Sequence, residues 1–229
     1  MVNTVGMARD KRAAQSGKLT GLDWIDAACL VIMERGVSAV AVEPLAQRLG
    51  VTKGSFYWHF PNRDALLQAT LERWEQMDTE AVISAVAQID DPLERLRQLI
   101  IEAMSYVLTS GGEAESGFTF GPAFDLAIAD AGSDPIVAPI LQRVSERRLD
   151  YLEQCYRAVG LAGDKARYQA LLAYAAYTGT LRLAREAPSR LPQDGEYLAY
   201  QQHLIATILP EDKRSDPARE DPVQPGTTT

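Results

Sequence analysis

The chain has few of the residues on which metal sites and nucleophilic catalysis depend. Among its 229 residues there are two histidines, His59 and His203, and two cysteines, Cys29 and Cys155. The cysteines lie 126 positions apart in apolar periodic segments, so we expect buried, unreactive thiols in a reducing cytoplasm. The sequence has no G-x-S-x-G nucleophile turn, no H-E-x-x-H metal motif and no G-x-x-x-x-G-K-S/T phosphate loop. We therefore expect no metal or cofactor, and a pair of carboxylates is the only basis left for an enzyme.

Long apolar runs and an excess of basic residues are also missing. The uncharged stretch from Tyr168 to Leu181 is 14 residues long, whereas a membrane span needs about 20. Asp and Glu number 31 against 23 Lys and Arg, a net charge of −8, which by itself disfavours a nucleic-acid partner. The charge is unevenly distributed, because residues 1–74 carry +2, residues 75–209 carry −8 and residues 210–229 carry −2. We expect a cytoplasmic protein without a membrane span, whose N-terminal part must be assessed separately for binding to nucleic acid.

Apolar residues recur with the period of an α-helix almost throughout the chain. Trp24, Ala27, Ala28, Val31 and Ile32 form such a stripe, and the Gly that follows at position 36 is a typical helix-ending residue. Start and stop signals predict about nine helices and no strand, and hence an all-α fold. The expected ranges are about 22–35, 42–49, 52–60, 62–89, 92–107, 122–129, 135–160, 164–185 and 195–209, with a loop over 110–117.

The two ends of the chain differ from this pattern. Residues 1–18 contain Arg9, Lys11, Arg12 and Lys18 without apolar periodicity, which predicts a flexible basic arm. Four prolines among charged residues predict a disordered tail over 210–229. The expected organisation is the arm, a first domain over 19–66, a second domain over 67–209 and the tail.

Within the first domain, two short helices over 42–49 and 52–60 are expected to meet at Gly50. Glycine is able to adopt the positive φ that a tight turn between helices requires, so the pair is typical of a helix-turn-helix. The hydroxyl of Thr52 is placed to cap the first turn of the second helix. In that helix, Phe56 and Phe60 lie one turn apart and are expected to pack against Leu45, Leu49 and Ile32.

Composition alone leaves two interpretations of this second helix open. It is a recognition helix in the major groove of DNA, or it is a packed aromatic helix with Tyr57 and Trp58 in the core of a bundle.

The order of residues closely resembles the TetR family of bacterial transcriptional repressors. Residues 50–60, Gly-Val-Thr-Lys-Gly-Ser-Phe-Tyr-Trp-His-Phe, follow the run that ends the turn and forms the recognition helix in that family, and Arg63 matches the basic residue that opens its next helix. The resemblance extends over about residues 22–71. It implies contacts to base edges or phosphates by Thr52, Lys53, Gly54 and Ser55, contacts to the DNA backbone by Tyr57, Trp58 and His59, and a phosphate clamp by Arg63.

Two features of the segment refine these expectations. Lys53 is the expected direct reader of bases, because its long side chain is able to reach guanine acceptors. Where the family often has Thr, Val and Arg at the start of the preceding helix, this chain has Ala41-Val42-Glu43-Pro44. That departure weakens the case for phosphate contacts from residues 42–49, and the basic arm is a possible substitute.

The second domain is expected to dimerise and to hold a ligand. Residues 168–181 have no clean polar face, so a two-fold homodimer through helices near 165–186 and 195–209 is expected, as in the family. Such a dimer places two recognition helices roughly 34–36 Å apart on a palindromic, double-stranded operator. The expected lining of a pocket for a small, mostly apolar effector is Met104, Phe118, Phe120, Phe124, Tyr151, Tyr174 and Tyr177.

The sequence thus predicts a ligand-responsive transcriptional repressor that the effector releases from its operator. Two alternatives stay open at this point. One is a helical small-molecule-binding protein without DNA binding, which Glu43 and the acidic balance favour. The other is a helical enzyme with a carboxylate pair in the second domain.

Overall fold

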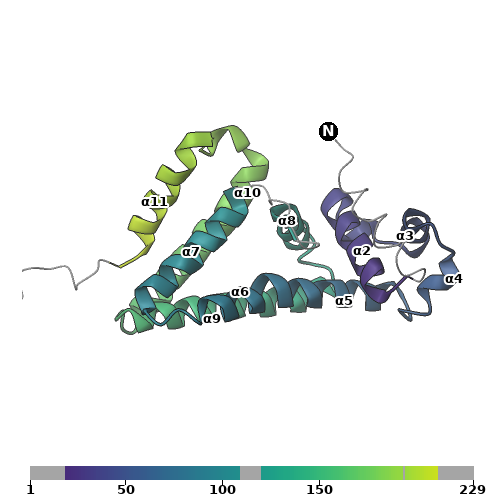
Figure 1. Ribbon diagram of the computed structural model, residues 1–229, viewed down its shortest axis with the longest axis horizontal. Helices are drawn as coiled ribbons and strands as arrows, with labels where there is room; N and C mark the ends of the chain where they lie inside the picture. The colour runs from purple at the N-terminus through teal and green to yellow at the C-terminus, as the bar shows by residue number, and fades with distance from the viewer. Residues whose placement is uncertain (1–18, 109–119, 193, 211–229) are drawn as a thin grey trace, which may run out of the picture.

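The computed structural model describes residues 19–108, 120–192 and 194–210, and every regular element in these ranges is helical (Figure 1). The all-α fold class is therefore confirmed. The α-helices are α2 (Gly21–Arg35), α3 (Val42–Leu49), α4 (Lys53–Phe56), α5 (Arg63–Glu75), α6 (Ala81–Val86), α7 (Pro92–Leu108), α8 (Pro122–Asp130), α9 (Val137–Ala158), α10 (Asp164–Glu186) and α11 (Tyr197–Ile208). Short 3₁₀ turns are η1 (Val37–Ala39), η3 (Pro188–Arg190) and η4 (Asp194–Glu196), and η2 (Gln76–Glu80) is a π turn.

The fold has two parts, a head that consists of α2, α3 and α4 and a body that contains α7, α10 and α11, and long helices connect them. In Figure 1, α2, α3 and α4 lie together at one end of the molecule, and α7, α10 and α11 lie at the other. The continuous helix made by α5, η2 and α6 runs along one side of the molecule with α9 and connects the two ends. Counting that helix once, the described residues contain the nine helices that the sequence predicts.

Side-chain caps fix where several helices begin. The Asp23 carboxylate accepts a hydrogen bond from the Thr20 N–H at 2.7 Å, and Asn62 Oδ1 accepts one from the Ala65 N–H at 2.8 Å. Asp91 Oδ1 accepts from the N–H groups of Leu93 and Glu94 at 2.8 and 3.1 Å. These bonds satisfy backbone donors that the first turn of a helix leaves unpaired.

The π turn η2 shifts the buried face of the helix by one residue. Such a turn closes from i to i+5 and so holds one residue more than an α turn. The buried stripe accordingly runs from Trp74 to Thr79 and then to Ile83, with a spacing of five across the turn. The sequence predicts the continuity of this helix but not its π turn.

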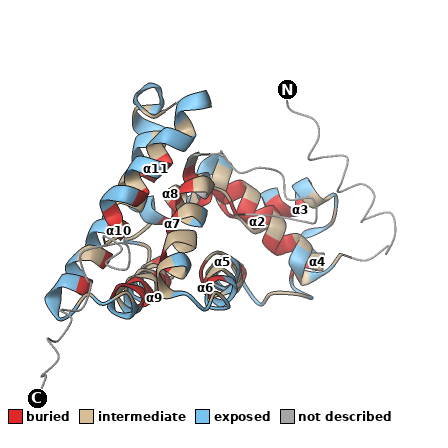
Figure 2. Cartoon of the chain, turned by 60° about the vertical axis from the view of Figure 1, so that its left-hand side comes forward, coloured by how far each residue is buried: buried red, intermediate tan, exposed pale blue. Residues whose placement is uncertain are grey.

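The buried residues, red in Figure 2, belong to two cores. The first core combines α2, α3, α4 and α5 with α8 and the first half of α9, and the second combines α6, α7, α10 and α11 with the rest of α9. Cys29 and Cys155 are buried in the first and second core respectively and are not bonded to each other. Because Phe124 and Ile128 of α8 belong to the first core, the head is packed onto the body by apolar contacts.

Some expectations remain predictions. The arm over 1–18, the loop over 110–117, Phe118 and residues 211–229 of the tail lie outside the described residues. The expected domain boundary between residues 66 and 67 also stays a prediction, although the first core extends across it.

Gly50 is the position where the turn between α3 and α4 depends on glycine. Its φ is +69°, and an added Cβ would meet no atom within 4 Å, so alanine would be penalised by backbone strain alone. We expect Gly50→Ala to lower the free energy of unfolding by about 1 kcal/mol, measured by urea denaturation followed by circular dichroism. Gly54→Ala is the matched control, because its Cβ would make an ordinary contact of 3.7 Å with Thr52 Oγ1. Equal losses in both variants would contradict this account of the turn.

Candidate nucleic-acid interface and effector pocket

The pair of helices α3 and α4 has the geometry expected of a helix-turn-helix. Gly50 ends α3 in the left-handed region, and the Val51 N–H donates to the Ala46 carbonyl at 3.0 Å. Phe56 anchors α4 because it is fully buried and meets Trp24 edge-on, with the ring centroids 5.2 Å apart. Phe60 packs beside it at 5.8 Å. The predicted packing of Phe56 and Phe60 against the core of α2 and α3 is confirmed.

The residues predicted to meet DNA lie on the surface of the head around α4. Thr52, Lys53 and Gly54 are exposed, and Ser55 and His59 are half-buried. Tyr57 is 53% exposed and Trp58 is 88% exposed. The interpretation that places Tyr57 and Trp58 in the core is therefore wrong.

The expected cap by the Thr52 hydroxyl is also wrong. Thr52 occupies the N-cap position with an extended backbone, but its side chain makes no capping hydrogen bond. The Ser55 N–H donates instead to the Thr52 carbonyl at 3.0 Å. The main chain therefore closes this turn, and the Thr52 hydroxyl is not used in it.

Lys53 is held by the carboxylate that the sequence singled out as a departure from the family. Its Nζ lies 2.5 Å from Glu43 Oε1, so the first turn of α3 is linked to the first residue of α4. The hydrogen bond and the charge of Glu43 raise the pKa of Lys53. Both side chains are at least half exposed, and ion pairs of this kind exchange readily for other partners.

Arg63 has a structural role that the sequence did not predict. Its Nε donates to the Val40 carbonyl at 2.9 Å and an η-nitrogen donates to the Val37 carbonyl at 3.0 Å, so it holds the segment between α2 and α3 against the start of α5. The other η-nitrogen lies 3.1 Å from Asp64 Oδ1. Carbonyl acceptors leave no mark in a sequence, which explains why this role was missed. The predicted phosphate clamp stays a prediction.

A small apolar pocket lies inside the body. Its volume is about 200 Å³, and η2, α6, α7, α9, α10 and the end of α11 form its walls. Four predicted pocket residues line it, namely Met104, Tyr151, Tyr174 and Tyr177. Phe120 and Phe124 do not, because they pack against each other at 4.8 Å in the first core, with Phe124 6.0 Å from Trp74.

A polar junction that the sequence did not predict lies beside this pocket. The buried carboxylate of Asp125 on α8 accepts from Trp74 Nε1 of α5 at 3.1 Å and from the Tyr177 hydroxyl of α10 at 3.4 Å. The guanidinium carbon of Arg148 on α9 lies 5.3 Å from the centre of the Trp74 ring and 6.0 Å from that of Tyr177. Four helices, α5, α8, α9 and α10, therefore meet at these side chains. Two of the side chains, Arg148 and Tyr177, also line the pocket.

Arginines of α9 hold the π turn from one side. Arg143 pairs with Glu75 at 2.8 Å and Arg147 pairs with Glu80 at 3.0 Å. In a regular α-helix, residues five apart point about 140° away from each other, so Glu75 and Glu80 would not face one partner helix together. The π turn brings both carboxylates to α9, where arginines four residues apart meet them.

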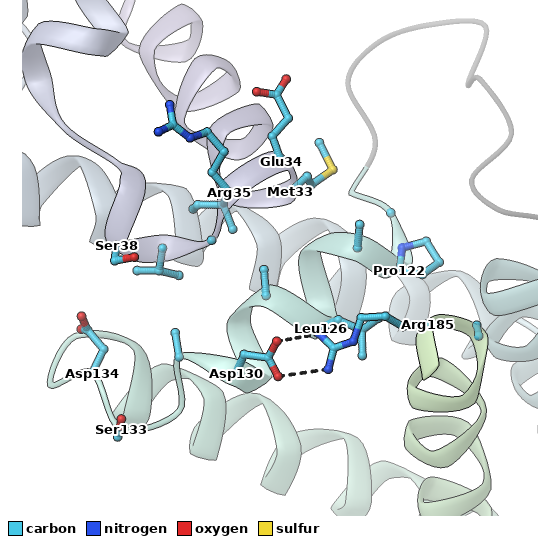
Figure 3. A pocket seen from close by; sticks show the side chains of 18 of the residues that line it. Met33, Glu34, Arg35, Ser38, Pro122, Leu126, Asp130, Ser133, Asp134 and Arg185 are labelled. Carbon is cyan, nitrogen blue, oxygen red and sulfur yellow. Dashed lines mark hydrogen bonds and ion pairs between the residues drawn. The ribbon is translucent and has the colours of Figure 1, made fainter. Parts of the chain in front are cut away.

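A second, wider hollow separates the head from the body. This cleft has a volume of about 1100 Å³ and lies between the end of α2, α8 and the end of α10. Figure 3 shows Asp130 and Arg185 joined within it, with contacts of 2.6 and 3.3 Å. Charged residues of both signs line the cleft, including Glu34, Arg35 and Asp134. The pocket inside the body is the more apolar of the two hollows and is therefore the better site for an apolar ligand.

Neither a metal cluster nor a membrane-spanning helix is found among the described residues. Within residues 19–108, 120–192 and 194–210, no group of three or more His, Cys, Asp or Glu is arranged to hold a metal ion. Across the same ranges, no helix combines the length and the apolar character that crossing a membrane requires.

Comparison with known proteins shows similarity to regulators. Residues 25–70 match the family described as bacterial regulatory proteins, tetR family. The HTH-type transcriptional regulator TtgR of Pseudomonas putida is 28% identical over 96 residues, 42% of this chain and 46% of TtgR, so the chain spans about half the length of that relative. An HTH-type transcriptional regulator of Mycobacterium tuberculosis is 29% identical over 193 residues, 82% of this chain and 94% of that protein.

Solved structures share the fold. AibR, crystallised with isovaleryl coenzyme A and operator DNA, superposes with a TM-score of 0.61 at 17% identity, over 83% of this chain and 98% of that chain. The family match and the head coincide, because residues 25–70 extend from α2 into α5 and include every residue predicted to contact DNA.

The role of Arg63 as a brace is testable by stability. Arg63→Ala leaves the Val37 and Val40 carbonyls without their charged donor, and we expect it to lower the free energy of unfolding by about 2 kcal/mol, measured by urea denaturation. Arg48→Ala is the control, because it removes an exposed ion pair with Glu34 and should cost less than about 1 kcal/mol. A side chain that serves only as a phosphate clamp would leave stability unchanged, and that result would contradict the brace.

Proposed function

Because this chain belongs to the TetR family through its N-terminal helix-turn-helix domain, we propose that it is a transcriptional repressor that binds an operator in double-stranded DNA and is released by a small, mostly apolar effector. The observation that carries the proposal is the exposed Trp58 and Tyr57 beside Lys53 on the head, within the matched residues. Side chains of these types stack on sugars, donate to phosphates and reach base edges. The bound DNA in the similarly folded AibR complex supports the same use of the fold.

Charge pairing on the head favours selective over non-specific DNA binding. Arg48 pairs with Glu34, Lys53 with Glu43 and Arg73 with Asp26. A cation that already has a carboxylate partner gains less from a phosphate, because the old pair must break first. Lys53 can still exchange Glu43 for DNA, but each such exchange gains less than an unpaired lysine would, so contacts to bases contribute a larger share of the binding.

A two-fold dimer supplies a second head, and with it a second recognition helix. Large apolar side chains are exposed along α10 and at the start of α11, where Tyr168, Leu171, Leu172 and Leu198 are each 47% to 63% exposed. Figure 2 shows this outer side of α10 and α11 largely exposed. Soluble monomers rarely leave such a surface uncovered, and a partner copy packed on it would make the protein a homodimer that binds a palindromic site.

The pocket and the head are linked by contacts that an effector would disturb. Arg148 and Tyr177 line the pocket, and both belong to the junction around Asp125 and Trp74. Trp74 lies on α5, the helix that leaves the head, and α8 packs on α2. A ligand that binds one arrangement of this junction better than another shifts the position of the head relative to the body, and so reduces operator affinity.

DNA binding is tested by replacing each member of the Lys53–Glu43 ion pair in turn. On a fragment from upstream of the gene, we expect Lys53→Ala to lose about 1–3 kcal/mol of binding and to relax the preference at one base pair. Glu43→Gln removes the competing carboxylate and should tighten binding to all fragments. Fluorescence anisotropy across a salt series measures both effects.

The control for this experiment is Lys165→Ala on α10, which should leave binding unchanged. If neither the wild type nor any variant raises the anisotropy of a labelled fragment at low salt, the chain is not a repressor, and the small-molecule-binding protein without DNA binding replaces that proposal.

The dimer is tested by charging its proposed surface. Leu172→Asp should convert a species of twice the 25.1 kDa chain mass into a monomer, measured by sedimentation velocity at micromolar concentration, since a buried unpaired carboxylate is strongly unfavourable. Leu22→Asp is the matched control because Leu22 is 57% exposed on α2. A wild type that sediments as a monomer would refute the dimer.

A further inference from the structure

Arg148 on α9 lines the apolar pocket, and its hydrogen-bond donors are only partly used. Its Nε donates to Thr79 Oγ1 at 2.9 Å, and the residue is half-buried. Within the described residues, its two η-nitrogens donate no hydrogen bond, and no carboxylate lies within ion-pair distance of them. A guanidinium carries five N–H donors, so most of those of Arg148 have no acceptor in this part of the chain.

The η-nitrogens of Arg148 border open space and are not sealed inside the protein. In the described ranges, the enclosed side-chain polar atoms without a partner are Trp24 Nε1 and the Tyr151 hydroxyl. The η-nitrogens also lack a partner but do not belong to that set, so part of their surface is accessible. Because Arg148 lines the pocket, the pocket is the space from which an acceptor reaches them.

The tyrosine hydroxyls next to Arg148 are already engaged. The Tyr174 hydroxyl donates to Ser145 Oγ at 3.1 Å. The Tyr177 hydroxyl donates to the Asp125 carboxylate at 3.4 Å. Polar groups removed from bulk water are nearly always paired in native proteins, so the contrast with Arg148 marks the position at which a ligand atom is needed.

Carboxylates near Arg148 act on its charge but do not bond to its donors. Burial lowers the pKa of Arg148, but four neighbours outweigh this effect and raise it overall, namely Tyr177, Asp125, Tyr174 and Asp78. The guanidinium is therefore a permanent cation. Coulomb energy falls with distance, so a ligand carboxylate in direct contact with Arg148 gains more from this cation than it loses to Asp78 or Asp125.

The surroundings of Arg148 favour a planar acceptor with two oxygens. Its guanidinium carbon lies 5.3 Å from the centre of the Trp74 ring and 6.0 Å from that of Tyr177, and its Nε is bonded to Thr79. These contacts hold the group and leave its η-nitrogens for a ligand. The donors of a guanidinium form a rigid fork that matches a carboxylate, and such charge-assisted bonds are roughly twice as strong as bonds between neutral groups.

The rest of the pocket determines the body of the ligand. Apolar side chains from α6 and α7 form much of its wall, including Val82, Ile83, Leu99, Ile100 and Met104. A cavity of about 150 Å³ is large enough to bind benzene, and drug-sized ligands occupy pockets of about 300–1,000 Å³. The volume of about 200 Å³ found here suits one ring or a short alkyl chain.

We propose that the effector of this protein is a small carboxylic acid, with its apolar body in the pocket and its carboxylate bound by the η-nitrogens of Arg148. Since Arg148 also lies against Trp74 of α5, the ligand binds at the junction that connects the pocket to the head. This inference rests on the proposed function in calling the molecule an effector, but the binding site itself is tested without DNA.

Four probes of similar size separate the chemical classes. They are 4-methylbenzoate, 4-methylbenzamide, p-xylene and 4-methylbenzylamine, titrated into the full chain by isothermal calorimetry at pH 7. We expect 4-methylbenzoate to bind about tenfold more tightly than the amide, because its charged oxygens make stronger hydrogen bonds to a guanidinium. The xylene and the amine should bind more weakly than the amide. Absence of benzoate binding, or equal or tighter binding of any other probe, would overturn the proposal.

Two matched variants on α9 identify the arginine responsible. Arg148→Met removes the η-nitrogens but keeps a long side chain, so it should abolish the preference for 4-methylbenzoate over 4-methylbenzamide and leave p-xylene binding unchanged. Arg157→Met removes a guanidinium that pairs with Glu153 and does not line the pocket, and it should leave the preference intact. A preference that survives in Arg148→Met, or that both variants lose, would contradict the proposal.

Asp78→Asn tests the same contact without changing Arg148, and it decides the question if circular dichroism shows that Arg148→Met does not fold. Asp78 lies at the edge of the pocket and is half-buried. Its neutralisation removes repulsion, so 4-methylbenzoate should bind about threefold more tightly while 4-methylbenzamide is unaffected. An unchanged affinity for 4-methylbenzoate would show that its carboxylate is not held in this pocket, and the proposal would fail.

A separate measurement distinguishes this proposal from the proposed function. If 4-methylbenzoate binds with the expected preference but DNA is bound equally well with and without it, the ligand class stands and effector control of DNA binding fails. If the chain binds no DNA fragment, the repressor fails while the calorimetric result still decides the ligand class.

Discussion

Asp125 places a carboxylate in the interior of the protein, and the arrangement of four helices depends on satisfying it. Its hydrogen-bond donors come from Trp74 on α5 and Tyr177 on α10, and Arg148 on α9 lies against the rings of both. Removing a hydrogen-bond donor from a buried acceptor costs about 1–3 kcal/mol, and more when the acceptor is charged. The helices that supply these donors are therefore not free to move independently. A displacement of α10 at the pocket has to be followed by α8 or α5, or the carboxylate loses its partners.

The same constraint connects the body to the head, because α8 has two roles. One side of it carries Asp125, and its apolar residues Phe124 and Ile128 lie in the core that α2, α3 and α4 share. A rearrangement at the junction therefore changes the packing beneath the proposed DNA-binding surface. No flexible segment between the junction and that surface is needed for this. The wide cleft beside α8 is lined by apolar as well as charged side chains, so α2, α8 and α10 are not packed against one another along their whole length.

The helices were predictable from the sequence because periodicity and capping are local properties. The bounds of α3, the cap at Asn62 and the turn at Gly50 were all readable from the order of residues. Tertiary partners were not. Arg63 meets backbone carbonyls, Asp125 meets residues about fifty positions away on either side, and Phe120 and Phe124 joined the first core because α8 folds toward α2. The sequence identified Glu43 as unusual, but only the structure supplied Lys53 as its partner.

The π turn has a further consequence for how this helix tolerates change. Continued as a regular α-helix from Trp74, the buried stripe would reach position 78, an aspartate, instead of Thr79. The extra residue therefore decides that Thr79 is the fully buried residue at this level, while Asp78 stays half-buried at the edge of the pocket. A deletion of one residue between Trp74 and Thr79 would let this segment close as a regular α-helix, in which Thr79 follows Trp74 at the usual spacing of four and α6 keeps its apolar face toward α7. The π turn is therefore the part of this long helix that can lose a residue, whereas a deletion in α5 or α6 would rotate everything beyond it by about 100°.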